Sequence, residues 1–170
     1  ENGMTDVIQP VVSKGQYEKV LSFLNLAKVS GAGVLTGGAV PDANVVGHEG
    51  GYFIEPTVLI DVTRESDLWQ KEVFGPVLSV RSFKTEEEAI EEANSTNFGL
   101  ASTVMSSEPA KAMRVANRIR SGAVYATSTG EGLLAEHPAV SRGGFGCSGI
   151  GRELGLGGLH EYTELKSVNY

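Results

Sequence analysis

Between residues 53 and 126 the sequence alternates segments typical of β-strands with short segments typical of α-helices. Residues rich in Val, Ile and Leu occupy 53–62, 77–83, 100–105 and 123–126, and helix-forming segments begin near 66, 85 and 107. Strands that alternate with helices are typical of crossover units, which make neighbouring strands parallel and bury the sheet between helices. We therefore predict an α/β fold with a mainly parallel sheet and crossover helices.

Local capping patterns mark where several helices begin. Ser13 and Gln16 match a capping box, in which each side chain bonds a backbone amide of the first turn, and they predict a helix over 13–30. The residues expected on its apolar face are Tyr17, Val20, Leu21 and Leu24. Gly31 suits a left-handed cap at its end.

Two further helix starts follow the same logic. Thr85 and Glu88 form a second capping box. Ser107 is the expected cap of a third helix, with Pro109 in its first turn and Gly122 ending it. Residues 34–36 are expected to form a strand and residues 41–51 a loop.

After Thr127 the sequence changes character, because ten of the 22 glycines lie between Gly130 and Gly158. So many glycines predict irregular backbone rather than helices or strands. Residues 164–170 alternate like a short exposed strand at the end of the chain. We accordingly separate residues 1–158 from a closing segment at 159–170.

Charge and cysteine content exclude several classes of protein. The 170 residues carry a net charge of −7, which repels nucleic acid and anionic membrane surfaces. No apolar run approaches the roughly 18 residues of a membrane span. The single cysteine, Cys147, cannot form an internal disulfide, which favours a reducing compartment such as the cytoplasm. The three histidines show no metal-ligand spacing, so no metal site is predicted.

Three local features have both a functional and a structural interpretation. Residues 144–149 match GxGxxG, but residues 138–142 before them make a poor strand and too little chain follows to build a dinucleotide-binding unit, so we reject a phosphate cradle. Cys147 is either a thiolate nucleophile or an inert loop residue. Glu72, beside Phe74, either holds a sugar through its carboxylate or is a solvated glutamate next to a core aromatic residue.

Five segments taken in order resemble the aldehyde dehydrogenase superfamily. They are GYFIEPT at 51–57, EVFGPV at 72–77, NFGLA at 97–101, GFGCSGIGRELG at 144–155 and YTELK at 162–166. The resemblance extends from about residue 10 to residue 170. It implies a fragment of an enzyme that oxidises an aldehyde to a carboxylic acid with NAD or NADP, in which Glu72 and Phe74 contact the ribose and nicotinamide end of the cofactor.

The resemblance also implies which groups this segment lacks. In the family, a cysteine thiolate attacks the aldehyde, hydride passes to the nicotinamide, and a water activated by a glutamate hydrolyses the thioester. Both residues lie upstream of Glu1, and Cys147 matches a variable position, so no catalytic residue is expected here. The fragment alone should be inactive.

Two departures from the family pattern lie near the aldehyde entrance. Thr127 and Ser128 follow the strand where the family usually has Asn, and Arg142 stands where Pro-Phe is common. Arg142 either favours an acidic aldehyde, because a guanidinium pairs with a carboxylate, or is a solvated surface residue. These three are the candidate substrate residues.

Two functions remain open at this stage. One is part of an aldehyde dehydrogenase that joins copies of itself through the C-terminal strand, as family members do. The alternative is a truncated, non-catalytic assembly or binding module. An upstream cysteine in a Gly-Gln-x-Cys context favours the first, and a natural start near Met4 favours the second.

Overall fold

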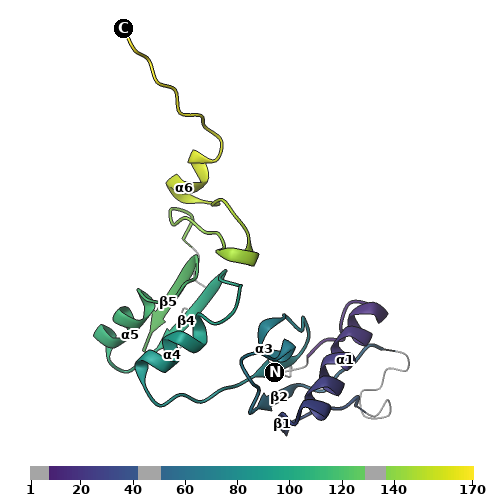
Figure 1. The fold of residues 1–170 in the computed structure, drawn as a ribbon. Helices are drawn as coiled ribbons and strands as arrows, with labels where there is room; N and C mark the ends of the chain where they lie inside the picture. The colour runs from purple at the N-terminus through teal and green to yellow at the C-terminus, as the bar shows by residue number, and fades with distance from the viewer. Residues whose placement is uncertain (1–7, 42–50, 129–136) are drawn as a thin grey trace, which may run out of the picture. The chain divides into compact units, whose positions relative to one another are not determined.

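The chain divides into two compact units, residues 1–82 and 83–170. A computed structural model describes residues 8–41, 51–128 and 137–170 (Figure 1). Each unit has its own sheet containing a parallel strand pair and its own helices, which confirms the α/β class. The predicted loop at 41–51 lies almost entirely outside the described residues. The strands expected from the alternating sequence are divided between two sheets.

The first unit begins with α1 (Lys14–Ser30), capped as the sequence indicates at both ends. The Ser13 hydroxyl accepts from the Gln16 amide at 3.3 Å. Gly31 takes a φ of 79°, and its N–H donates to the Ala27 carbonyl, closing the helix as predicted. The capping box is only half formed, because the Gln16 side chain does not return to the helix start.

A three-stranded sheet with the order β1-β2-β3 follows α1. It consists of β1 (Gly33–Thr36), β2 (Thr57–Ile60) and β3 (Val77–Ser79). β2 and β3 are parallel and are connected through the short α3 (Asp67–Gln70), whereas β1 pairs antiparallel with β2. Thr57 links the segment after β1 to the segment before β2. Its hydroxyl accepts from the Gly38 amide and donates to the Glu55 carbonyl, both at 2.8 Å.

The core of this unit lies among α1, β2, α3 and the segments that flank them. Its buried members on α1 recur at helical spacing, whereas Tyr17 and Leu21, expected on the same face, lie at its margin. Leu59 on the central strand is completely buried. The cluster comprises Val20, Phe23, Leu24, Ala27, Ile54, Leu59, Val62, Leu68 and Val73.

The second unit contains a crossover of the predicted kind. β4 (Ala101–Met105) and β5 (Ala123–Thr127) pair in parallel over five residues and are connected by α5 (Pro109–Ala116). α4 (Glu86–Ala93) precedes them, and Thr85 caps it as expected, whereas the Glu88 side chain bonds the residue before the cap. Thr85 Oγ1 accepts from the Glu88 amide at 3.1 Å, and the Glu88 carboxylate accepts from the Lys84 amide at 2.7 Å.

Four details differ from the sequence-based expectations. One is the end of α5, which lies at Ala116 with Asn117 as its cap rather than at Gly122. The cap of α5 is Glu108, with no side-chain capping bond, rather than Ser107, because Pro109 begins the helix and the residue before a proline is held extended. The glycine-rich region contains the turn η1 (Gly146–Ser148) and the short α6 (Gly155–His160), which its glycines conceal from propensity rules. The tail at 163–170 forms no strand within the described chain, because a strand needs a hydrogen-bonded neighbour.

Candidate functional site

The EVFGPV segment lines a hollow of about 550 Å³ between α3 and β3. Glu72 and Phe74 are exposed within it, while the side chain of Val73 between them is 8% exposed and belongs to the core. The core therefore anchors the segment at its centre and presents the carboxylate and the ring outward. The other lining residues are Leu68, Lys71, Gly75, Val77 and Ser79.

Phe74 combines an exposed ring with a strained backbone. Its φ is 59°, in the left-handed region that residues with a Cβ rarely adopt, and 65% of its surface is exposed. Such a conformation costs on the order of 1–3 kcal/mol and persists only where the surroundings enforce it. Two contacts with α1 enforce it: the Phe74 carbonyl accepts from Gln16 Nε2, and Gly75 packs on Val20, so closely that a Cβ at Gly75 would lie 2.5 Å from Val20 Cγ2.

Lys71, the cation next to Glu72 in the sequence, is directed to another partner. Lys71 Nζ lies 2.7 Å from Asp67 Oδ2, one helical turn earlier. The Lys71 charge is thus balanced by Asp67 at the surface. Glu72 presents carboxylate oxygens, which are hydrogen-bond acceptors, to any ligand in the hollow.

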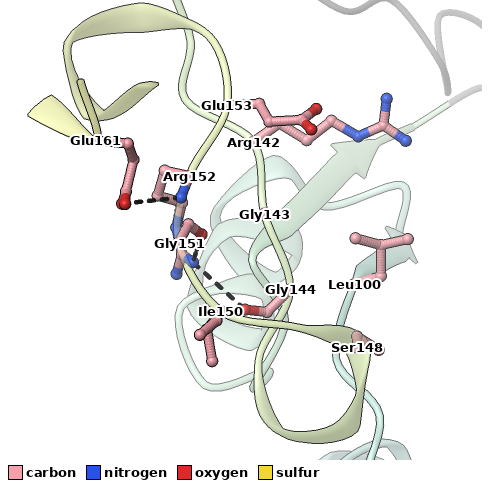
Figure 2. A pocket seen from close by; sticks show the side chains of 10 residues that line it. All are labelled: Leu100, Arg142, Gly143, Gly144, Ser148, Ile150, Gly151, Arg152, Glu153 and Glu161. Carbon is pink, nitrogen blue, oxygen red and sulfur yellow. Dashed lines mark hydrogen bonds between the residues drawn. The ribbon is translucent and has the colours of Figure 1, made fainter. Parts of the chain in front are cut away.

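A second hollow, of about 480 Å³, lies against the glycine-rich loop of the second unit (Figure 2). Here two of the family-like segments, NFGLA and GFGCSG, meet. The Gly99 carbonyl accepts from the Phe145 amide at 2.9 Å, the Asn97 carbonyl accepts from the Cys147 amide at 2.8 Å, and the Gly99 amide donates to Ser148 Oγ at 3.0 Å. The Phe145 and Cys147 amides are used within the chain, which agrees with rejecting GxGxxG as a phosphate cradle.

Arg152 links separate parts of the same loop by hydrogen bonds (Figure 2), and sequence reasoning did not identify it. Its Nη1 donates to the carbonyls of Gly144 and Gly151 at 3.3 and 2.6 Å, and its guanidinium lies 5.2 Å from the centre of the Phe145 ring. The Arg152 amide donates to Glu161 Oε1 at 3.2 Å. The only sequence signal for this residue was its place in the GRELG part of the resemblance.

The three candidate entrance residues lie at different places relative to β5. Arg142 pairs its backbone with Glu153, two hydrogen bonds of 2.7 Å, and lines a hollow of about 270 Å³ with the first residues of β5. Thr127 ends β5, and its carbonyl accepts from the Ser106 amide at 3.1 Å. Ser128 follows, exposed. Arg142 therefore lies toward one end of β5 and Thr127 at the other.

Other candidate chemistry is limited in the described parts of the chain. Cys147 is a free, exposed thiol in η1. Residues 8–41, 51–128 and 137–170 contain no cluster of three or more side chains suited to hold a metal ion. Within the same ranges, no helix has the length and apolar character that crossing a bilayer requires.

The chain belongs to the aldehyde dehydrogenase family, whose family model matches residues 3–168. It is 43% identical over 160 residues to the chloroplastic betaine aldehyde dehydrogenase of Beta vulgaris and 45% identical to the peroxisomal aminoaldehyde dehydrogenase 2 of Pisum sativum. Both alignments cover 94% of this chain and 30% of the relative, so the chain spans about a third of their length.

Solved structures agree with this assignment. The Staphylococcus aureus betaine aldehyde dehydrogenase in complex with NAD+ superposes with a TM-score of 0.80 at 40% identity, covering 90% of this chain and 29% of that one. An NAD-dependent aldehyde dehydrogenase from Sinorhizobium meliloti superposes with a TM-score of 0.78 at 36% identity, covering 92% and 29%. The resemblance read from the five segments is confirmed.

Proposed function

We propose that this chain is the C-terminal portion of the catalytic domain of an NAD(P)-dependent aldehyde dehydrogenase, which oxidises an aldehyde to a carboxylic acid. Residues 1–158 belong to that domain, and 159–170 form a closing segment. The observation that carries the proposal is the pairing of an exposed carboxylate, Glu72, with an exposed ring, Phe74, in one hollow of a chain from this family.

The two side chains suit the nicotinamide half of such a cofactor. A carboxylate accepts hydrogen bonds from two ribose hydroxyls, and an aromatic face packs against a flat ring. The hollow of about 550 Å³ lies within the usual size range of ligand sites. The cofactor, when bound, supplies the hydride acceptor of the oxidation. A relative crystallised in complex with NAD+ supports NAD as the first cofactor to test.

The test of this proposal is Glu72→Ala in the full-length enzyme. Loss of a charge-assisted hydrogen bond to ribose costs about 1.5–3 kcal/mol, so we expect NAD affinity and kcat/KM for NAD to fall roughly ten- to a hundredfold. Glu91→Ala, which removes an exposed glutamate from α4, is the matched control and should leave both unchanged. Unaltered kinetics across a full NAD titration of Glu72→Ala would disprove the cofactor role.

We further propose that the nucleophile and the general base lie outside these 170 residues. Cys147 is exposed on a loop, and its amide is tied to Asn97 for local structure. The isolated chain should therefore oxidise no aldehyde with NAD or NADP, and Cys147→Ser in the full-length enzyme should retain most activity. A loss on the order of 10⁴-fold in that variant would identify Cys147 as the nucleophile instead.

Two observations favour different aldehydes as the substrate. Relatives are named betaine aldehyde and aminoaldehyde dehydrogenases, which makes an aldehyde with a cationic nitrogen our first choice. Arg142, by contrast, would attract a carboxylate and repel a cation. Comparing kcat/KM for a cationic and an anionic aldehyde of equal length, in wild type and Arg142→Gln, decides between them. A preference for the anion that Arg142→Gln abolishes would favour an acidic substrate.

Assembly and location follow as the remaining proposals. The exposed tail at 164–170 is proposed to pair with another subunit, since an unpaired strand-like segment offers amides and carbonyls to a second chain. Light scattering on the full-length enzyme, with and without the residues after Glu164, tests this. An unchanged oligomer after deletion excludes the tail as the contact between subunits.

A cytoplasmic location is proposed from the single cysteine, although plant relatives are named chloroplastic and peroxisomal. Tagging the protein in its own cells and observing where it accumulates tests this proposal.

A further inference from the structure

The two capping boxes predicted from sequence behave differently in one respect. In α4, the Glu88 side chain turns back toward the helix start and accepts from the backbone amide of Lys84, the residue before the cap. In α1, the Gln16 side chain turns away and donates its Nε2 to the carbonyl of Phe74, with the Val73 carbonyl 3.5 Å from the same atom. A side chain in the first turn of α1 thus bonds a backbone group 58 residues later.

The chemical type of the side chain explains this difference. A carboxylate can only accept, so Glu88 needs a donor, and here the donor is a backbone N–H. An amide can donate, and Gln16 uses this capacity on a carbonyl. Glutamate at position 16 could complete the capping box and would suit the positive end of the helix, yet it could not donate to Phe74.

The residue that receives this bond is the one whose backbone is strained. Phe74 has a φ of 59°, and its exposed ring obtains little stabilisation from burial. Val20, one turn after Gln16, lies against Gly75, and Val73 is held in the core. The same face of α1 therefore supports the carbonyl of Phe74 and the residue that follows it.

We propose that Gln16 is a positioning residue for the cofactor site: by holding the Phe74 carbonyl, it keeps Phe74 in the left-handed conformation that turns its ring outward into the hollow shared with Glu72. This inference rests on the proposed role of Phe74 in holding the cofactor. Gln16 acts through Phe74 and needs no contact with the ligand. Without its donor, the segment from Glu72 to Gly75 relaxes toward an ordinary φ, and the ring leaves its place.

The experiment measures the NAD dissociation constant of the full-length enzyme by titration calorimetry, which does not depend on turnover. Gln16→Met removes the donor with little change of shape, Gln16→Glu replaces it with an acceptor, and Gln16→Lys retains a donor. We expect Gln16→Met to weaken NAD binding about three- to tenfold, the effect of one neutral hydrogen bond, and Gln16→Glu to weaken it more. Gln16→Lys should bind NAD close to the wild-type value.

A double-mutant cycle with Phe74→Ala separates positioning from direct contact. If Gln16 acts through the ring, Gln16→Met and Gln16→Glu have no further effect on NAD binding in the Phe74→Ala background. A full effect in that background would overturn the inference, because Gln16 would then influence NAD binding by a route other than the Phe74 ring. Thermal melting serves as the readout of structure: we expect similar Tm values for Gln16→Glu and wild type, because glutamate is a good residue at this helix position.

The remaining outcomes distinguish this inference from the proposed function. If Phe74→Ala and Glu72→Ala weaken NAD binding and both Gln16→Met and Gln16→Glu leave it unchanged, only the role of Gln16 is wrong. If Phe74→Ala leaves NAD binding unchanged, the cofactor role of Phe74 fails and the inference fails with it.

Discussion

The two units of this chain are stabilised in different ways. The first has a core of nine buried apolar side chains gathered around α1 and β2. In the described part of the second, only Ile90 and Ala112 are buried apolar residues, while Phe98, Met105, Ile150 and many others are exposed. Since burial is the main source of folding free energy, the first unit contains much more of what its own stability requires.

In the second unit, close contacts between backbone segments provide much of the stabilisation that apolar burial provides in the first. Gly122 lies so near Gly143 that a Cβ would be 1.5 Å from its carbonyl oxygen. Gly99 is also confined, with the Arg120 carbonyl oxygen 2.4 Å from its Cβ position. Such contacts hold the glycine-rich loop against β5 and NFGLA through geometry and hydrogen bonds rather than through apolar burial. We therefore predict that different kinds of substitution destabilise the two units: truncation of a buried side chain in the first, and addition of a Cβ at a confined glycine in the second.

The largest expected effect is that of Leu59→Ala in the first unit. Leu59 is completely buried on the central strand, so its truncation should cost about 2–5 kcal/mol. Hydrogen exchange on the full-length protein should show lost protection in α1 and β2. Ile90→Ala in α4 is the counterpart and should cost less, because fewer buried neighbours surround it. Equal losses in the two units would contradict a core concentrated in the first.

A smaller effect is expected from Gly122→Ala in the second unit. The new Cβ meets backbone rather than a flexible side chain, so the loop at 143–144 has to shift, at a cost of about 1–3 kcal/mol. Protection should fall in residues 97–101 and 143–155 and remain in α1. Gly15→Ala is the control: apart from the neighbouring backbone of α1 itself, no atom lies within 4 Å of its Cβ position, and alanine in the first turn of α1 should stabilise by up to about 1 kcal/mol. Unchanged protection around residue 143 in Gly122→Ala would exclude the close contact.

The smallest effect concerns the ion pair that joins α4 and α5. Arg114 hydrogen-bonds both Glu86 carboxylate oxygens, at 2.8 and 2.6 Å, and these bonds lower the pKa of Glu86 below its ordinary value of 4.5. A lowered folded-state pKa means that the stabilisation is present above about pH 4.5 and is lost as the pH falls through the lower, folded-state value. The difference in Tm between wild type and Glu86→Gln should shrink over that range and in 1 M salt. A Tm difference that does not change with pH would show that the Glu86–Arg114 ion pair contributes nothing to stability.

Much of the local structure was predictable because it depends on near neighbours in the sequence. The caps at Ser13, Gly31 and Thr85 involve residues three or four positions apart, and all three are formed. The apolar spacing along α1 likewise placed Val20 and Leu24 in the core. Propensity failed at α6, where three glycines in six residues concealed a helix, and at the tail, where alternation alone cannot supply a neighbouring strand.

The sequence by itself determined the family, through five short segments in order, and it named Glu72 and Phe74 through that resemblance. Only the tertiary structure decided that Gln16 supports Phe74 rather than its own helix, that NFGLA meets the glycine-rich loop, and that Arg142 and Thr127 lie toward different ends of β5. The physical reason is separation along the chain. The Gln16 and Gly99 bonds join residues 58 and 49 positions apart, and such partners are selected by the packing of whole elements, which no local pattern records.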